Sequence, residues 1–118
     1  MGYYSDVAIA MRKKDLEQML GEALKLNDDK WIYSFIQEGA LNAPIFNDAD
    51  YALLTWTDYK WYDTKGEVSF IKNFLNDLDY SHYDFLRIGE DYEDIEYHYG
   101  TGEDFLYLNR SIGFGPRF

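Results

Sequence analysis

Helical spacing of apolar residues is the feature that most constrains what this chain can fold into. Within residues 14–26 the apolar side chains recur at i, i+3, i+4, i+7 and i+8, which gives one apolar stripe along a helix. That stripe consists of Leu16, Met19, Leu20, Ala23 and Leu24. A second helix is predicted over residues 64–78, where Thr64 and Glu67 have the spacing of a capping box. Its buried stripe is predicted to be Val68, Ile71, Phe74, Leu75 and Leu78.

Strand patterns surround these two helices. Residues 3–11 carry larger apolar side chains on one face and alanines on the other, which is typical of a central strand covered on both faces. Aromatic and β-branched residues dominate residues 51–62, the strongest strand candidate. Further strands are predicted over residues 83–88, 95–99 and 105–112. Residues 31–37 fit either a short helix or a strand, and the sequence leaves both alternatives open.

The order of these segments predicts an α+β fold. A strand, a helix, an undetermined segment, a strand, a helix and two or three strands form one antiparallel or mixed sheet of four to six strands. The two main helices are expected on one face of this sheet. A ferredoxin-like or split βαβ arrangement fits the order. The 118 residues suffice for a single domain, residues 1–118, with a sizeable core.

The charge balance excludes several classes of partner and site. The chain has 11 basic and 22 acidic residues, a net charge of −11, so phosphate backbones and anionic membranes repel it. We therefore expect neither direct nucleic-acid binding nor membrane contact. The absence of cysteine excludes disulfides, thiolate zinc sites, cysteine nucleophiles and iron–sulfur clusters. No targeting pattern is found at the start of the sequence, so we expect a cytoplasmic protein.

Most of the excess negative charge lies in one segment. Residues 77–104 hold ten acidic residues and a single base, Arg87, and a hairpin within them would bring these charges close together. One interpretation is a solvated loop that keeps the protein soluble. The other is a negative patch that meets a positive one on a partner. The predicted contacts of that patch are Glu90, Asp91, Glu93, Asp94 and Glu96, with Tyr92 as an anchor.

A group of large aromatic residues forms a second candidate surface. It consists of Trp56, Tyr59, Trp61 and Tyr62. Strand alternation places Tyr59 and Trp61 on one face and the other two on the opposite face. Helices can cover only one of these faces, so at least half of the group is expected in the core. The remainder is expected to be exposed, as an interaction surface or a dimer contact.

Catalytic motifs are not found in the sequence. His82 and His98 lie 16 residues apart, and there is neither a nucleophile elbow nor a phosphate-binding loop. The late carboxylates do not have the spacing of a calcium-binding loop, because no glycine occupies the sixth place. We predict no catalytic residue, no metal site and no cofactor. A metal-dependent enzyme acting through the carboxylates is kept as an alternative.

Three runs of residues resemble short acidic proteins encoded by bacteriophages and prophages. They are residues 1–8 (MGYYSDVA), 56–62 (WTDYKWY) and 85–91 (FLRIGED), about a fifth of the chain. The resemblance implies a setting and carries over no catalytic residue. Small acidic phage proteins often block a host defence system or polymerase by binding a basic nucleic-acid site, as several anti-CRISPR and anti-restriction proteins do.

We therefore predict a non-enzymatic inhibitor in the host cytoplasm. It would occupy the basic cleft of a nucleic-acid-binding host protein (a CRISPR effector, a restriction enzyme or a polymerase) as a nucleic-acid mimic. One alternative is an immunity protein against a basic nuclease toxin. Another is a phage structural or assembly protein that associates through residues 56–62, for which a homodimer is one form.

Overall fold

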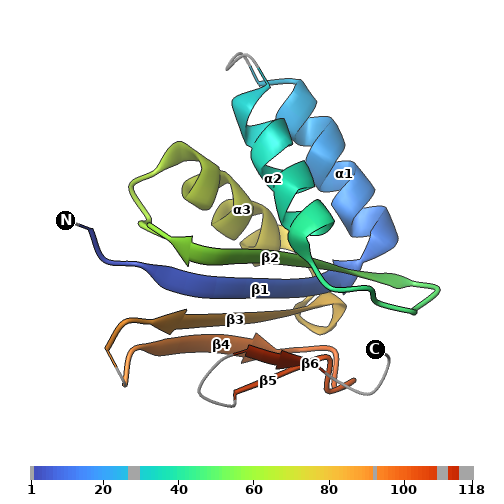
Figure 1. Ribbon diagram of the computed structural model, residues 1–118. Helices are drawn as coiled ribbons and strands as arrows, with labels where there is room; N and C mark the ends of the chain where they lie inside the picture. Colours follow the sequence, from blue (N-terminus) through green and yellow to red (C-terminus); the bar gives the residue numbers. More distant parts are fainter. Residues whose placement is uncertain (1, 27–29, 92, 109–111, 115–118) are drawn as a thin grey trace.

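The fold is α+β, as the sequence predicts, with three main helices rather than two (Figure 1). The computed structural model describes residues 2–26, 30–91, 93–108 and 112–114. The helices are α1 (Lys13–Leu24), α2 (Trp31–Asn42), α3 (Gly66–Asp77) and a short 3₁₀ turn, η1 (Tyr80–His82). The strands are β1 (Ser5–Arg12), β2 (Tyr51–Tyr59), β3 (Tyr83–Gly89), β4 (Ile95–Tyr99), β5 (Leu106–Leu108) and β6 (Ile112–Phe114).

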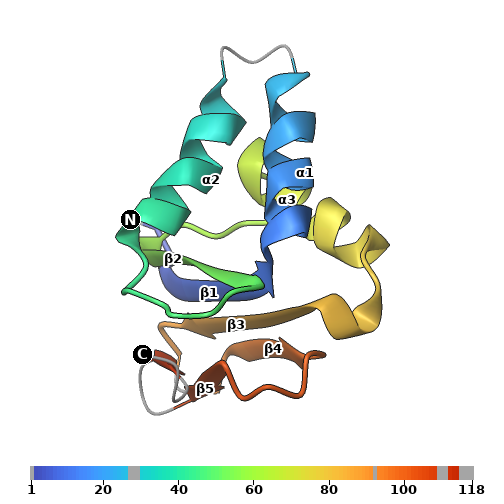
Figure 2. The same cartoon turned by 90° about the vertical axis from the view of Figure 1, so that its right-hand side faces the viewer.

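The undetermined segment 31–37 is the first half of α2. This helix buries Ile32, Phe35, Ile36 and Gly39, which follow the i, i+3, i+4, i+7 spacing of a helical face. In α1, Met19 and Ala23 are buried, whereas Leu24 at the end of the predicted stripe is exposed. The two helices pack side by side above the sheet (Figure 2).

Four strands form one antiparallel sheet in the order β2-β1-β3-β4. The first strand is central, as its pattern predicts. Strands β2 and β3 flank it and are joined by α3, which makes a split βαβ unit. The element order differs from the ferredoxin-like one, because α1 and α2 both lie between β1 and β2 and because the β3–β4 hairpin comes last.

The two faces of the sheet bury different kinds of side chain. Helices α1, α2 and α3 cover one face, and the C-terminal segment with β5 and β6 lies on the other (Figure 1). On the second face the small side chains of Ala8 and Ala10 leave room for Phe105. The ring of Phe105 lies 4.8 Å from that of Tyr51, measured between centroids. Both faces of β1 are therefore covered, as the alternation of its residues predicts.

A β-bulge interrupts the alternation at the end of β2. Ser5 pairs with Tyr59 and Val7 with Trp56, so β2 contains one residue more than β1 over the same length. Asp58 takes the extra step with a positive φ of 52°, a conformation that aspartate tolerates better than most residues. The bulge turns Tyr59 to the same side as Trp56. The predicted placement of Trp56 and Tyr59 on opposite faces is therefore wrong, and because β2 ends at Tyr59, strand alternation does not apply to Trp61 and Tyr62.

Helix α3 begins later than the capping box predicts. Lys65 is its N-cap residue and makes no side-chain capping bond, so the predicted pairing of Thr64 with Glu67 is wrong. Glu67 is buried instead, and its carboxylate accepts a hydrogen bond from the hydroxyl of Tyr59. The predicted apolar stripe is confirmed, with Leu78 partly buried against the core and the other four residues fully so: Val68, Ile71, Phe74 and Leu75. Among the described residues no helix is both long and apolar enough to span a membrane.

Candidate acidic interaction surface

The acidic segment forms the hairpin that the sequence predicts. Strands β3 and β4 pair with Arg87 opposite Glu96 and Ile88 opposite Ile95. The turn between them closes with a hydrogen bond from the Gly89 amide to the Asp94 carbonyl, 2.8 Å long. The five predicted carboxylates are thereby brought into one region, but they do not share one role.

Two of the five carboxylates are bound by Arg87. Its guanidinium donates to both carboxylate oxygens of Asp94, at 2.7 and 3.1 Å, and to Glu96 at 3.0 Å. The same group donates to the hydroxyl of Ser5 at 3.1 Å. Bidentate contacts, like the one with Asp94, are among the strongest hydrogen bonds that arginine makes with carboxylates. We name Ser5, Arg87, Asp94 and Glu96 the Arg87 cluster.

Tyr3 ties the N-terminal segment to this cluster. Its hydroxyl donates to Asp94 at 2.7 Å and accepts from the backbone amide of Asp91 at 2.9 Å. Gly89 lies close to this contact, because an added Cβ would lie 2.3 Å from an Asp94 oxygen and 2.4 Å from the Tyr3 hydroxyl. A larger residue at position 89 would therefore displace these two side chains from each other.

Electrostatics fix the charge of Asp94. Hydrogen bonds from Arg87 and then from Tyr3 lower the pKa of Asp94 to about 2. The hydrogen bond to Asp94 in turn raises the pKa of Arg87. Glu96 also contacts Lys72 of α3 at 3.1 Å, so its charge is balanced from two sides. Asp94 and Glu96 thus serve the fold of the hairpin.

The remaining carboxylates stand apart from any base. Glu90, Asp91 and Glu93 are exposed, and none of them has an ion-pair partner among the described residues. We name these three the acidic tip. The predicted anchor, Tyr92, lies outside the described residues. Of the predicted contact residues, the acidic tip is therefore the part that is available to a partner.

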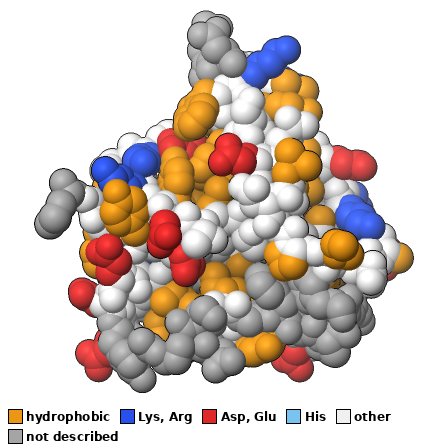
Figure 3. All heavy atoms as spheres, viewed as in Figure 1, with side chains coloured by type: hydrophobic (Ala, Val, Ile, Leu, Met, Phe, Trp, Pro, Cys, Tyr) orange, Lys and Arg blue, Asp and Glu red, His pale blue; other side chains and the backbone are white. Residues whose placement is uncertain are grey.

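A hollow of about 270 Å³ lies beside the acidic tip. Four carboxylates line it, and among the described residues no Lys, Arg or His does so. They are Asp6, Asp58, Glu90 and Asp91. In Figure 3, acidic side chains gather at the lower left, over the β3–β4 turn and the start of β1. Unpaired carboxylates around a hollow favour a cationic side chain as occupant.

Sequence reasoning missed Asp6 and Asp58, which belong to no acidic run. Strand pairing brings them to the tip, because β1 pairs with both β2 and β3. The carboxylate of Asp6 accepts a hydrogen bond of 3.0 Å from the backbone amide of Asp58 in the bulge. The contact between Asp6 and Asp58 follows from the register of the three strands, and no local sequence pattern predicts it.

Half of the candidate aromatic surface lies in the core, as the sequence predicts for at least half of it. Trp56 and Trp61 are 4% and 6% exposed, and their ring centroids lie 5.5 Å apart. Phe35 stacks on Trp56 with centroids 4.9 Å apart. Tyr59 binds Glu67 as described above, and the Tyr62 hydroxyl accepts the Tyr3 amide at 2.6 Å. Trp56 and Trp61 thus serve the core, whereas Tyr59 and Tyr62 are only partly buried.

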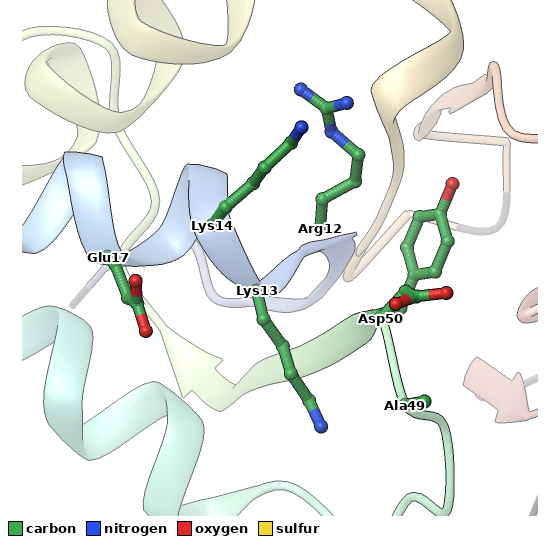
Figure 4. A pocket seen from close by; sticks show the side chains of 7 residues that line it. Arg12, Lys13, Lys14, Glu17, Ala49 and Asp50 are labelled. Atoms are coloured by element: carbon green, nitrogen blue, oxygen red, sulfur yellow. The ribbon is translucent and has the colours of Figure 1, made fainter.

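A larger cavity, of about 510 Å³, lies at the start of α1 (Figure 4). It is lined by both signs of charge: Arg12, Lys13, Lys14, Glu17 and Asp50, with Ala49 and Tyr51. Figure 4 shows Lys13 pointing away from the side on which Arg12 and Lys14 lie, so the three cations do not converge. Arg12 is moreover bound to Asp15 at 2.7 Å. The cations of this cavity thus do not form a common binding point.

Buried titratable groups are held by internal contacts. Asp84 accepts hydrogen bonds from the amide and hydroxyl of Thr101, at 2.9 and 2.8 Å, while burial raises its pKa. The ring of His98 stacks on Tyr83, with centroids 4.1 Å apart. No group of three or more His, Asp or Glu within the described residues is placed to hold a metal ion. The contacts of Asp84 and His98 thus join β3, β4 and the segment after β4.

No family model, curated protein or solved structure matches this chain.

Proposed function

We propose that this chain is a non-enzymatic binding protein that occupies a basic cleft of a nucleic-acid-binding partner. The observation that carries the proposal is the hollow beside the acidic tip, which four carboxylates and no base line within the part of the chain that the structure describes. Such a surface attracts arginine and lysine side chains, which are the groups that line nucleic-acid channels.

Charge placement supports a partner of this class. Helices α1–α3 cover one face of the sheet. Acidic and basic residues are mixed around the cavity at the start of α1. At the acidic tip the charge is of one sign. Attraction between oppositely charged surfaces speeds association and weakens as salt screens it. We therefore expect binding that is strong in dilute salt and lost at high ionic strength.

A capture experiment tests the proposal. The immobilised chain is offered proteins of a bacterial lysate that were first retained on a DNA column. A tip variant replaces Glu90, Asp91 and Glu93 with Lys. The matched control carries the same change in net charge on exposed helix positions: Glu17→Lys, Glu38→Lys and Asp77→Lys.

The expected result is capture by the wild type and the control, and a loss of about tenfold or more with the tip variant. A soluble DNA duplex should displace the captured proteins, because both compete for one basic cleft. Equal losses in the tip variant and the control would mean that only net charge matters. Retention by the tip variant, or no displacement by DNA, would refute the proposal.

A further inference from the structure

Strand β4 is an outer strand of the sheet, and its hydrogen-bonding pattern is fixed by its partner. Gly100 donates to the Tyr83 carbonyl at 3.2 Å, and Gly89 donates to the Asp94 carbonyl at 2.8 Å. In an antiparallel pair such bonded positions recur at every second residue. The even-numbered residues of β4 therefore bond to β3, and the odd-numbered ones direct their backbone groups away from it.

The outward groups of β4 have free capacity. Within the described part of the chain, the N–H and C=O groups of Tyr97 and Tyr99 have no backbone partner. The carbonyl of Ile95 is likewise outward, whereas its amide bonds locally to the Glu93 carbonyl at 3.1 Å. Unpaired edges of this kind are templates for another strand.

The opposite edge of the sheet is protected, and β4 is not. Strand β2 carries the bulge at Asp58, a device that twists an edge away from pairing. Strand β4 has no bulge in its register with β3. Its sequence, IEYHY, contains neither lysine nor proline, the residues that usually block an edge.

We infer that β4 pairs with β4 of a second copy of this chain, antiparallel and centred on Tyr97. This register sets Tyr97 opposite Tyr97 and Ile95 opposite Tyr99, so every outward position meets an outward position of the other copy. Bonded positions then coincide, as an antiparallel ladder requires. The two sheets become one continuous sheet about a two-fold axis, and the interface is self-complementary.

Side chains support the same register. Tyr97 and Tyr99 are 66% and 43% exposed and stack with centroids 5.1 Å apart. Pairing at Tyr97 extends this stack across the axis, since opposed aromatic residues stabilise antiparallel strands. On the other face Glu96 lies opposite His98 of the second copy, so the register sets no two like charges opposite each other.

Sedimentation equilibrium tests the inference over about 5–500 µM protein, because a short edge buries a small area and binds weakly. We expect the average mass to rise from one chain towards two as concentration increases. Each copy carries a net charge of −11, so added salt should strengthen self-association by screening repulsion. Binding of a basic partner should weaken under the same change, which separates this inference from the proposed function.

Two variants and a control locate the interface. Tyr97→Lys sets two charges against each other on the axis, and Tyr97→Pro removes an outward amide without removing a bond to β3. The control, Trp31→Lys, also exchanges an exposed aromatic residue for lysine, far along the chain in α2. We expect monomers from both Tyr97 variants at concentrations where the wild type and the control form dimers. Circular dichroism confirms that each variant is folded.

Amide hydrogen exchange reads the pairing directly. On dimerisation the Tyr97 and Tyr99 amides should slow about tenfold or more, while the Glu96 and His98 amides, already bonded to β3, should change little. A monomer at every concentration, or a dimer without this alternation, would overturn the inference. If the chain is monomeric and Tyr97→Lys lowers the capture of a basic partner, the edge pairs with a foreign strand and the inference is likewise overturned.

Discussion

The acidic tip and the Arg87 cluster come from the same acidic run but differ in their electrostatic environment. In the cluster, Arg87 satisfies Asp94 and Glu96 by direct hydrogen bonds. At the tip, three carboxylates face solvent and have no ion-pair partner among the described residues. A run of acids in a sequence therefore mixes structural charges with available ones. Only the pairing of strands assigns each carboxylate to one of the two roles.

Removal of Arg87 should have the largest effect on stability. Arg87→Ala leaves Asp94 and Glu96 close together without their shared cation, and we expect a loss of about 3 kcal/mol in the free energy of unfolding. Arg87→Lys keeps one charge but not the two-pronged contact, so its loss should be intermediate. Urea denaturation measures both. A loss below about 1 kcal/mol for Arg87→Ala would show that the cluster does not hold the hairpin.

Acid should weaken the cluster by a smaller amount. The pKa of Asp94 is about 2 in the folded state against 3.8 for the free group, so its stabilisation is present above pH 4 and lost as the pH falls towards 2. Asp94 is 35% exposed, so screening limits this contribution to about 1 kcal/mol.

Comparison of the wild type with Asp94→Asn isolates that contribution from other groups. Burial raises the pKa of Asp84, whose effect has the opposite sign: its stabilisation is present at low pH and is lost as the pH rises. Denaturant titrations at several pH values should show the difference between the two proteins narrowing between pH 4 and 2. A constant difference across this range would contradict the role assigned to Asp94.

Charge reversal at the acidic tip should have the smallest effect on stability. With Glu90, Asp91 and Glu93 replaced by Lys, the free energy of unfolding should change by less than about 0.5 kcal/mol, because exposed charges contribute little. The melting temperature measures this directly. A marked destabilisation would place the tip among the structural charges and remove the distinction between the two regions.

Local patterns predicted the elements whose stabilisation is local. The stripe of α3 and the two-sided burial of β1 follow from periodicity, because each side chain's face is fixed by its own helix or strand. The segment 31–37 was ambiguous because it is aromatic and short, and burial against Trp56 in the folded protein decides for a helix. The indole nitrogen of Trp56 donates a hydrogen bond to the Phe35 carbonyl at 3.2 Å.

Features that depend on distant pairing could not be predicted. The hydrogen bond from Tyr3 to Asp94 joins residues 91 positions apart, and no composition or spacing rule links them. The bulge at Asp58 turned Tyr59 to the face of Trp56, because one additional residue in a strand moves the next side chain to the other face. Counting charges along the sequence located the hairpin. It did not show which of the carboxylates bind Arg87 and which are exposed at the acidic tip.

The burial of two tryptophans determines how unfolding of this chain can be followed by fluorescence. Of its three tryptophans, Trp56 and Trp61 are buried in contact with each other, while Trp31 is 53% exposed. A small neutral quencher therefore reaches one indole in the native protein and all three after unfolding. Quenching of the intrinsic tryptophan fluorescence therefore reports the opening of the core, and it needs no added label.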